Sequence, residues 1–499
     1  MKYIVNSEEM RAIDRYTSEV IGIPSIVLME KASIKMACFL LAKIDRHDRI
    51  VAVCGTGNNG GDGAATARIL FQKGYQVDIL VAGNIEKMSE QMKLQIQIAK
   101  NLGMSVLNSA KISEYTIVID AMFGVGLKRP VTGVFAEIIS EINEAENTVF
   151  SVDLPSGISA DTGKILNIAV KADYTVTFGY TKFGLLVYPG CGYAGETVTA
   201  DIGFPKMAGE KISPRAFLYE KEDLSKLPGR KDYSNKGTYG KVLVIAGSEN
   251  ISGACYLSAK AAYRIGAGLV KVLTHEKNRT VIGTLLPEAL LSDYTEERLQ
   301  TEEGMKQIQK EIEWSDVIVI GPGIGTSKAA VMLMEIVLAE KKVPVVMDAD
   351  AVNLLSEKWK ISKDAFELPE QVILTPHLKE MSRLTNRTVS EIAENLLETA
   401  ENFTKDKKLV LALKDTRTVV SDGEKMYLNV SGNHGMATGG SGDVLSGIIG
   451  GLLAQGMELF DAAALGVYIH GLAGNYAAEE KNCYSLMASD IIDAISFIL

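Results

Sequence analysis

The segment ATGGSGDVLSG, residues 437–447, combines a glycine-rich loop with a single carboxylate. Four glycines surround Ser441 and Asp443, and apolar residues then repeat at helical spacing. A loop at a helix N-terminus presents free backbone N–H groups and partial positive charge, which favour an anion. An aspartate beside that anion can accept a hydroxyl proton, as phosphoryl transfer to an alcohol requires. We expect the helix dipole to keep Asp443 ionised. The alternative is a plain helix cap worth about 1 kcal/mol.

Three further glycines, Gly447, Gly450 and Gly451, fall inside the helix predicted after Asp443. Each costs up to about 1 kcal/mol relative to alanine in a helix interior. We therefore expect the helix backbone to approach a neighbouring element or a ligand closely.

A similar string, GNNGGDG, occupies residues 57–63 after a predicted strand, and we expect a helix to begin near Gly61. Glycine lets the backbone approach a ligand closely. The string fits the dinucleotide pattern GxGxxG only loosely and lacks the Gly-Lys-Ser/Thr of a Walker loop. A tight turn with Asp62 at the helix start and a phosphate-binding loop are about equally supported. In a binding loop, the amides of Asn58 and Asn59 are expected to matter more than Asp62.

Two neighbouring predicted strands end in carboxylates. Asp120 closes TIVID, while Asp153 closes VFSVD and precedes Ser156 in LPSG. The carboxyl ends of parallel strands share one edge of a sheet, where ligands bind. A buried carboxylate is costly unless it is paired or coordinated, and aspartate, asparagine and serine oxygens suit a hard cation. Loop capping is the alternative for either aspartate alone.

A second set of polar strand ends lies in the C-terminal half. GPGIG (321–325) and MDADAVNLL (347–355) each follow an apolar run, and His377 follows another. In LALKDTR, Lys414, Thr416 and Arg417 are suited to hold phosphate oxygens. The alternatives are a structural loop histidine and a solvated basic turn.

Continuous apolar runs alternate with helix-like segments throughout the chain. Such runs indicate strands buried on both faces, and the alternation predicts parallel, doubly wound sheets. The predicted strands are 50–55, 76–83, 115–124, 148–157 and 174–180, then 241–248, 268–274, 316–323, 343–350, 371–377 and 408–414. Proline, glycine and charge concentrate in 205–240, so we predict an α/β chain with two domains, 1–213 and 214–499.

The composition limits the classes of function. A chain of 499 residues with 47% hydrophobic and 23% charged residues has ample material for two buried cores. A net charge of -10 argues against general binding to nucleic acid or an anionic membrane. The five cysteines form no CxxC pair, so neither a disulfide framework nor a zinc site is expected. MKYIVNSEEM lacks the apolar run of a signal peptide, and we expect a cytoplasmic protein.

Several motifs in fixed order resemble known families. TGGSGD with the preceding GNHGMA resembles the ribokinase-like superfamily, in which this aspartate deprotonates the acceptor hydroxyl. GPGIG, MDADAVNLL, LTPHLKEMSRL and GNHGMATGGSGDVLSG together resemble ADP-dependent NAD(P)H-hydrate dehydratases, whereas NNGGDG, DAMFGVG and VDLPSG resemble NAD(P)H-hydrate epimerases. Over nearly the whole length, the chain resembles the bifunctional NAD(P)H-hydrate repair enzymes. That resemblance implies a Rossmann-like epimerase domain, a doubly wound α/β/α sandwich, at 1–213. It implies a ribokinase-like dehydratase domain at 214–499.

The resemblance also implies roles for individual residues. The epimerase half would bind the hydrated dinucleotide through Asn58, Asn59, Gly60, Gly61, Asp62, Gly124, Val125, Gly126, Leu127, Lys128, Arg129, Pro130 and Asp153. Asn59, Asp120 and Ser156 would hold a potassium ion, and Asp120 would also serve acid–base chemistry. In the dehydratase half, Ala254, Gly325, His377 and Asp443 would contact the hydrate, and Lys414, Asp415, Thr416, Arg417, Thr418 and Gly442 the adenine nucleotide. Asp415 stands where the family usually has glycine, which reshapes the turn and places a carboxylate near the phosphates.

The implied reaction repairs NAD(P)H that has gained water at C6 of its nicotinamide ring. The first domain would interconvert the R and S hydrates. The second would use ADP with Mg²⁺, and Asp443 as base, to phosphorylate the S hydrate, whose loss of phosphate restores NAD(P)H and leaves AMP. The expected substrates are NADHX and NADPHX, with a homo-oligomer and neither nucleic acid nor membrane as partner. The alternatives are a vitamin or sugar kinase fused to a nucleotide-binding domain and, for the first domain, a nucleotide sensor or lipid-carrier-binding scaffold.

Overall fold

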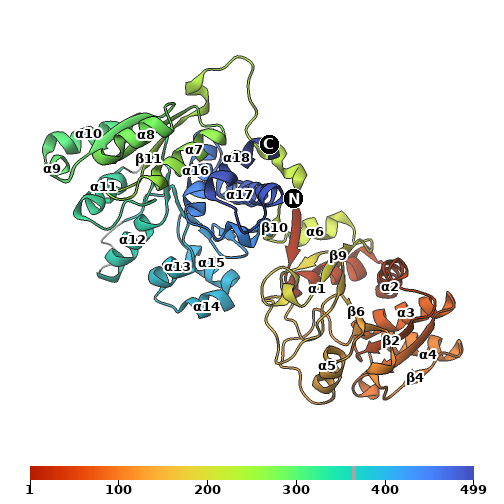
Figure 1. The fold of residues 1–499 in the computed structure, drawn as a ribbon. Helices are drawn as coiled ribbons and strands as arrows, with labels where there is room; N and C mark the ends of the chain where they lie inside the picture. Colours follow the sequence, from red (N-terminus) through yellow and green to blue (C-terminus); the bar gives the residue numbers. More distant parts are fainter. Residues whose placement is uncertain (341, 362–366) are drawn as a thin grey trace. The chain divides into compact units, whose positions relative to one another are not determined.

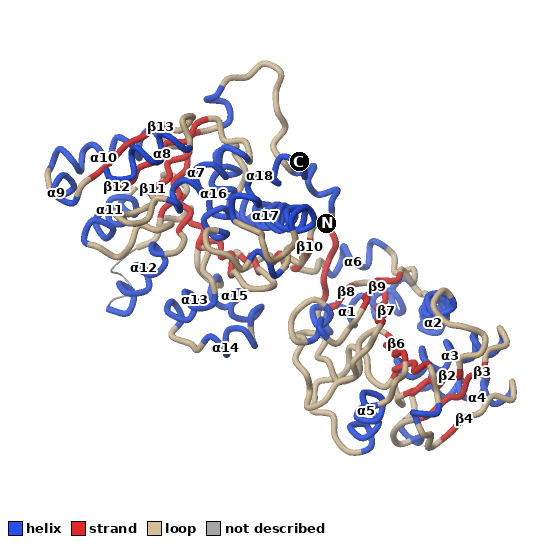
Figure 2. The backbone as a smooth tube through the Cα atoms, viewed as in Figure 1, coloured by secondary structure: helices blue, strands red, loops and turns tan. Residues whose placement is uncertain are grey.

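A computed structural model describes residues 1–340, 342–361 and 367–499 of the chain. These residues form two compact units, one of Tyr3–Ala216 and one of Phe217–Leu499 with Met1–Lys2 (Figure 1). Figure 2 shows strands inside each unit and helices around them. No helix in the described ranges is long and apolar enough to cross a membrane.

The first unit contains a seven-stranded parallel sheet with the order β4-β3-β2-β5-β6-β7-β9. The chain fills the sheet outward from β2 in one direction and then from β5 in the other. The crevice between the carboxyl ends of β2 and β5 is where ligands bind in such sheets. The strands are β2 (Arg49–Cys54), β3 (Gln76–Val81), β4 (Val106–Leu107), β5 (Ile117–Ala121), β6 (Thr148–Val152), β7 (Tyr174–Phe178) and β9 (Glu196–Ala200), and β1 (Lys2–Val5) pairs with β8 (Thr181–Lys182).

Helices cover both faces of this sheet. Ile50, Ala52 and Cys54 of β2 belong to one apolar core, which is completed by α2, α3 and α4, whereas Val51 and Val53 belong to a second core with α5. Burial on both faces explains the continuous apolar runs and confirms the predicted doubly wound arrangement. The helices are α1 (Ser7–Arg15), α2 (Ser25–Leu41), α3 (Asn58–Gln72), α4 (Glu90–Asn101), α5 (Val134–Glu144) and α6 (Lys206–Ile212).

The prediction that α3 begins near Gly61 is wrong, because the helix begins at Asn58. Gly60 and Gly61 therefore lie in its first turn rather than in a loop. A Cβ on Gly60 would lie 1.8 Å from the carbonyl oxygen of Gly55, and one on Gly61 would lie 2.6 Å from Cε of Met29. Gly60 therefore lets the helix start pack against the backbone that follows β2, and Gly61 lets it pack against α2. The short edge strand β4 and the polar edge strand β9 were also not predicted, because neither contains a long apolar run.

The second unit is built around a parallel run of strands, β13-β12-β11-β14-β15-β16-β17, which continues through antiparallel β18 and β19. The six strands predicted for this unit are present, whereas β13 was not predicted. The strands are β10 (Ala216–Leu218), β11 (Lys241–Ile245), β12 (Leu269–His275), β13 (Leu290–Tyr294), β14 (Val317–Ile320), β15 (Val345–Met347), β16 (Val372–Leu374), β17 (Leu409–Leu413), β18 (Val419–Ser421) and β19 (Met426–Leu428).

The helices of this unit include a central one, α16, that packs on α7 and on the sheet. They are α7 (Gly253–Arg264), α8 (Arg279–Leu285), α9 (Glu296–Leu299), α10 (Glu302–Trp314), α11 (Lys328–Ala339), α12 (Asp350–Ile361), α13 (Leu378–Thr385), α14 (Val389–Glu394), α15 (Leu396–Thr404), α16 (Ser441–Ala454), α17 (Leu459–Lys481) and α18 (Ala488–Ile498).

The start of α16 excludes one of the two interpretations of Asp443. The N-cap residue is Gly440, in a left-handed conformation with φ 89°, and no side chain caps the helix. Asp443 lies two residues inside the helix, in its first turn. The interpretation of Asp443 as a plain cap is therefore wrong, since the capping position precedes it by three residues.

The interior glycines of α16 are explained by close packing, as predicted. An added Cβ would lie 2.1 Å from the Ser258 carbonyl oxygen at Gly447, 2.4 Å from Val319 at Gly450 and 2.3 Å from Ile265 at Gly451. Real Cβ atoms do not approach other atoms so closely, so α16 can reach α7 and β14 only without these side chains.

Replacement of Gly447 by alanine is expected to destabilise the second unit. The methyl group must push α16 away from the α7 backbone, at a cost of about 1–3 kcal/mol in the free energy of unfolding. Urea unfolding of the full chain measures the change. Gly229→Ala is the matched control, because no atom lies within 4 Å of the added Cβ, and it should change the free energy by less than about 0.5 kcal/mol. Equal stability of the two variants would contradict the packing argument.

Candidate active sites

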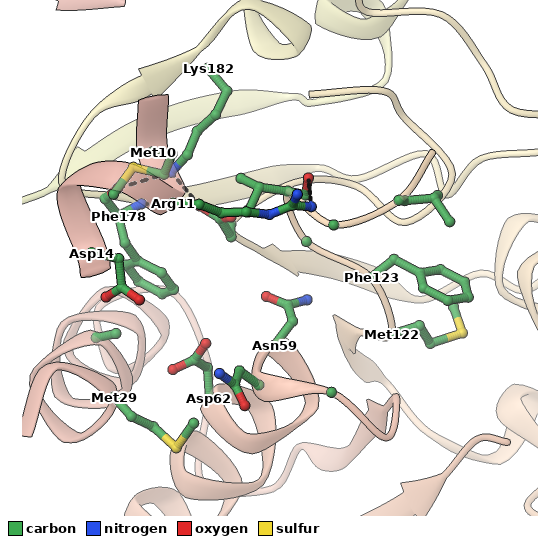
Figure 3. A pocket seen from close by; sticks show the side chains of 18 of the residues that line it. Met10, Arg11, Asp14, Met29, Asn59, Asp62, Met122, Phe123, Phe178 and Lys182 are labelled. Carbon is green, nitrogen blue, oxygen red and sulfur yellow. Dashed lines mark hydrogen bonds and ion pairs between the residues drawn. The ribbon is translucent and has the colours of Figure 1, made fainter. Parts of the chain in front are cut away.

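A cleft of about 880 Å³ lies in the first unit (Figure 3). Its walls come from α1, α2, the start of α3, the segment after β5 and residues near β6–β8. An apolar cleft with a few convergent polar groups is typical of a small-molecule site. It is lined by Met10, Arg11, Asp14, Ser25, Leu28, Met29, Ala32, Thr56, Gly57, Asn58, Asn59, Asp62, Met122, Phe123, Gly124, Val125, Gly126, Leu127, Lys128, Arg129, Phe135, Asp153, Phe178, Lys182, Ile202 and Phe204. Of the residues predicted to bind substrate in the first domain, all but Gly60, Gly61 and Pro130 line this cleft.

A buried ion pair forms one wall of this cleft. The Lys182 side chain is only 1% exposed, and its Nζ lies 2.6 Å from Oδ1 of Asp153. Nζ also donates hydrogen bonds to Oγ1 of Thr177 and the carbonyl oxygen of Phe178, both at 2.9 Å. Three acceptors around one ammonium group satisfy the hydrogen bonding that a buried charge requires. Asp153 has φ 69°, so its position depends on a left-handed backbone at the end of β6.

Asp120 and Ser156 meet directly beneath the cleft, as the strand-end argument predicts. Oδ1 of Asp120 accepts hydrogen bonds from Ser156 Oγ (2.6 Å) and Met122 N (3.3 Å). Oδ2 accepts from Ser156 N and Ser151 Oγ, both at 2.8 Å. Burial raises the pKa of Asp120, and the hydrogen bonds from Ser156 oppose that change. Asp120 does not line the cleft.

Asn59 completes the group that was predicted to hold potassium. Its side chain lies against Gly124, where an added Cβ would be 3.1 Å from Asn59 Oδ1. Its Nδ2 is buried without a hydrogen-bond partner. Rotating the amide by 180° would place an oxygen there instead, a choice that heavy-atom positions do not fix. Carbonyl, hydroxyl and carboxylate oxygens suit a hard cation. In the described part of the chain, no group of three or more His, Cys, Asp and Glu residues is arranged to hold a metal ion.

Two further carboxylates point toward one another in the cleft, Asp62 from α3 and Asp14 from α1 (Figure 3). Burial, then the negative charges of Asp153 and Asp14, hold the pKa of Asp62 well above its ordinary value, although Lys182 opposes them. Burial also raises the pKa of Asp14. Burial in this part of the cleft therefore disfavours the ionised form of both carboxyl groups.

Cationic side chains also line the cleft. Arg11, Lys128 and Arg129 are exposed, and Nη2 of Arg11 donates a 3.4 Å hydrogen bond to the carbonyl oxygen of Val125. Arginine and lysine at a cleft wall are suited to bind phosphate oxygens. The cleft therefore contains cations that can bind the phosphates of a dinucleotide and carboxyl groups that can bind its ring.

The second unit contains its own buried ion pair, at the carboxyl ends of β15 and β17. Nζ of Lys414 lies 2.6 Å from Oδ1 of Asp348, whose other oxygen accepts a 2.5 Å hydrogen bond from Ser446 Oγ of α16. A Cβ on Gly442 would lie 3.2 Å from Nζ of Lys414. Lys414, Gly442 and Asp443 are therefore brought together at the start of α16, where the helix dipole and the ammonium group favour an anion.

Asp443 lies beside this pair, but its ionisation differs from the prediction. Burial, followed by the negative charge of Asp348, raises the pKa of Asp443 to about 7, while Lys414 opposes the rise. The prediction that the helix dipole keeps Asp443 ionised is wrong, because desolvation and a neighbouring carboxylate outweigh the dipole. A pKa near neutrality suits a general base, which must accept a proton and later release it.

His377 occupies a structural position as well as the predicted strand mouth. It is the N-cap of α13, and its Nδ1 accepts hydrogen bonds from the backbone N–H groups of Lys379 (3.0 Å) and Glu380 (3.2 Å). Burial, then the charge of Lys414, lowers the pKa of His377. The imidazole is half exposed, and its Nε2 lies 3.4 Å from Oε1 of Glu380.

The other predicted residues surround the same strand ends. Ala254 is buried in α7, one turn before Ser258, whose Oγ donates to the carbonyl oxygen of Asp443 at 2.9 Å. Gly325 N donates to Asp350 Oδ2 at 2.9 Å. The remaining predicted nucleotide residues, Asp415, Thr416, Arg417 and Thr418, form the turn between β17 and β18.

Comparison with known proteins places both units. The family described as NAD(P)H-hydrate dehydratase matches residues 242–496, and the family described as YjeF-related protein N-terminus matches residues 25–184. The bifunctional NAD(P)H-hydrate repair enzyme of Moorella thermoacetica is 37% identical over 100% of this chain and 96% of its own length. The chain belongs to the bifunctional NAD(P)H-hydrate repair enzymes. The enzyme of that name from Escherichia coli is 31% identical over 99% of this chain and 93% of its own.

Solved structures add the fold of the second unit. An ADP/ATP-dependent NAD(P)H-hydrate dehydratase from Bacillus subtilis, crystallised with ATP and Mg²⁺, is 30% identical with a TM-score of 0.50. It covers 56% of this chain and 96% of its own. A ribokinase-like superfamily protein from Enterococcus faecalis has 30% identity and a TM-score of 0.51, covering 57% and 95% of the two chains. The repair enzyme therefore has a ribokinase-like second unit, as predicted.

Sequence reasoning missed four side chains of these sites: Lys182, Asp348, Asp14 and Arg11. Asp348 was inside a quoted motif, MDADAVNLL, but nothing in the sequence marks which of its aspartates pairs with Lys414. Lys182 ends the two-residue strand β8, and Arg11 and Asp14 lie in α1, before the matched residues 25–184. The sequence signal that could have identified Lys182 is a charged residue within an apolar stretch.

Removal of the Lys182 ammonium group is expected to destabilise the first unit strongly. Lys182→Met leaves the Asp153 carboxylate buried without its partner, which costs about 3–5 kcal/mol in the free energy of unfolding. Denaturant unfolding of the full chain provides the measurement. The control is Lys128→Met, which breaks a 3.4 Å exposed pair with Glu8 and should cost about 0–1 kcal/mol. A similar, small loss in both variants would show that the buried pair does not hold the unit together.

Proposed function

We propose that residues 1–213 of this repair enzyme interconvert the R and S forms of hydrated NADH and NADPH, and that residues 214–499 dehydrate the S form using ADP. Membership of the family supports both steps. The observation that carries the second step is the placement of Asp443 beside Lys414 and the N-terminus of α16. An anion site and a base at one point are what phosphoryl transfer to a hydroxyl requires.

The dehydration follows from this geometry in two stages. Asp443 accepts the proton of the C6 hydroxyl, whose oxygen attacks the β-phosphorus of ADP and displaces AMP. The free N–H groups of α16 and the Lys414 ammonium group stabilise the negative charge on the transferred phosphoryl group. Loss of phosphate from C6, with a proton from C5, then restores the ring of NAD(P)H. Mg²⁺ bound to the nucleotide phosphates would neutralise part of their charge.

The predicted contacts define where each substrate lies. The nucleotide lies at Lys414, Asp415, Thr416, Arg417, Thr418 and Gly442, and the hydrate at Ala254, Gly325, His377 and Asp443. The Bacillus subtilis relative is described as ADP/ATP-dependent, and we propose ADP as the donor for this chain. Asp415, in place of the usual glycine, adds a negative charge at the phosphate turn.

In the first unit, the proposed substrate is the hydrated dinucleotide in the 880 Å³ cleft. The exposed cations Arg11, Lys128 and Arg129 bind its phosphates, which leaves the nicotinamide ring for the acidic part of the cleft. The oxygens of Asn59, Asp120 and Ser156 would hold potassium beneath the binding loop, where the ion would fix the backbone of that loop. We also propose a cytoplasmic homo-oligomer.

Substitution of the proposed base is expected to abolish dehydration. Asp443→Asn, incubated with S-NADHX and ADP, should lower the rate by about 10²–10⁴-fold, because an amide cannot accept the hydroxyl proton. The near-ultraviolet absorbance of regenerated NADH measures the rate. The same variant should still convert R-NADHX into S-NADHX in the first unit. A vitamin kinase of the same fold would instead phosphorylate its vitamin and leave NADHX unchanged, and that result would refute the proposal.

The pH dependence of dehydration is expected to follow Asp443. Because the base must be ionised, the rate should fall as the pH drops through about 7. In Asp348→Asn the neighbouring negative charge is absent and Lys414 is released from its ion pair. The acidic limb of the pH–rate profile, where the rate falls, should therefore move to lower pH by about one unit. Glu424→Gln, a change at an exposed turn, is the control and should leave the limb in place. An unshifted limb in Asp348→Asn would show that these charges do not set the pKa of the base.

A further inference from the structure

The cleft of the first unit contains three carboxylates, and the structure treats them differently. Asp153 is paired with Lys182 at 2.6 Å. Asp62 and Asp14 line the same space, and within the described residues no hydrogen bond or ion pair reaches the Asp62 carboxylate. A carboxyl group that faces a ligand cleft without a protein partner has both its oxygens available to a substrate.

Asp120, the acid–base group expected from the sequence, lacks that freedom. Its two oxygens already accept four hydrogen bonds, from Ser156, Ser151 and Met122. It is fully buried and does not line the cleft. A group that must exchange protons with a substrate atom needs to lie within hydrogen-bond reach of it. Asp120 is thereby fitted to fix the loop around Ser156 rather than to touch the ring.

Building on the proposed epimerase function, we propose that Asp62 is the catalytic residue that carries the proton between the R and S hydrates. Arg11, Lys128 and Arg129 line the same cleft and can bind the phosphates, and Asp62 and Asp14 then remain for the C6 hydroxyl. The assignment reverses the expectation that the neighbouring asparagines of the GNNGGDG string matter more than its aspartate.

The charges around Asp62 favour its protonated form. Asp14 faces it from α1, Asp153 from the end of β6, Lys182 from β8 and the Cys54 thiol from β2. Burial and the two aspartates raise the pKa of Asp62, and the single cation, Lys182, is committed to Asp153. Asp62 therefore holds its proton more firmly than an ordinary aspartate, which suits a general acid.

The proposed exchange of the R and S hydrates needs only water as a co-reactant. Asp62 gives its proton to the C6 hydroxyl, the C6–O bond breaks with its electron pair on oxygen, and water leaves. The lone pair of ring nitrogen N1 forms a C6=N1 double bond, which makes C6 planar. A water molecule then adds to the opposite face of C6, the electron pair of C6=N1 returns to N1, and the proton released by that water returns to the Asp62 carboxylate through cleft water. The hydrate is inverted at C6, and no net proton or electron is consumed.

The test uses the full chain and R-NADHX without ADP, with the two epimers separated by chromatography. Asp62→Asn should lower kcat for R-to-S exchange by about 10²–10⁴-fold while KM changes little, because the amide keeps the shape of the side chain. Asp62→Glu, which retains a carboxyl group, should restore part of the rate. Asp78→Asn is the matched control, since Asp78 bonds Tyr115 outside the cleft, and it should leave the rate unchanged.

The dehydration activity of the second unit serves as a control for the folding of each variant. Dehydration of S-NADHX with ADP by Asp62→Asn should equal that of the unsubstituted chain. In the unsubstituted chain the exchange rate should fall as the pH rises above the pKa of Asp62, and Asp62→Asn should lack this limb. If the unsubstituted chain does not accelerate exchange, the proposed epimerase function fails. If it does and Asp62→Asn keeps its rate within tenfold, the function stands and the assignment of Asp62 is overturned.

Discussion

A buried lysine–aspartate pair at the carboxyl edge of a parallel sheet recurs in both units, and the sites depend on it. Lys182 and Asp153 lie 2.6 Å apart in the first unit, and Lys414 and Asp348 lie 2.6 Å apart in the second. Burying a charge is costly unless a partner and hydrogen bonds replace water. Each lysine therefore forms its buried ion pair with one carboxylate. Among the described residues, Asp62 and Asp443 have no ion pair of this kind.

Because only one carboxylate of each site is paired with a lysine, the neighbouring carboxyl groups are able to exchange protons. Asp62 and Asp443 lie next to the paired carboxylates, so they experience burial and negative charge together. Both effects favour the neutral acid, and they raise the pKa of Asp443 to about 7. Two unrelated sheets thus use one electrostatic arrangement, although the proposed roles differ: Asp62 begins as an acid and Asp443 as a base.

Close backbone packing brings these groups to the strand ends. Gly60 lets α3 start against Gly55, and Gly447 lets α16 lie against Ser258. Because the helices begin so close to the sheets, their free N–H groups and their first-turn aspartates share one space. The glycine-rich strings are therefore needed for close packing of the helices. Sequence patterns alone would assign these glycines only to ligand binding. The joining of the two proposed activities has a chemical logic, since dehydration consumes only the S hydrate and exchange converts the R hydrate into it.

The sequence by itself determined the features that depend on near neighbours. Continuous apolar runs predicted the buried parallel strands, helical spacing predicted α16, and motif order predicted the family. The tertiary structure alone decided which charges meet. Lys414 and Asp348 are 66 residues apart, and Lys182 and Asp153 are 29 apart, so no local pattern links them. It also decided that Asp443 is not a cap and that Asp120 is enclosed, because desolvation and Coulomb interactions depend on distances through space rather than along the chain.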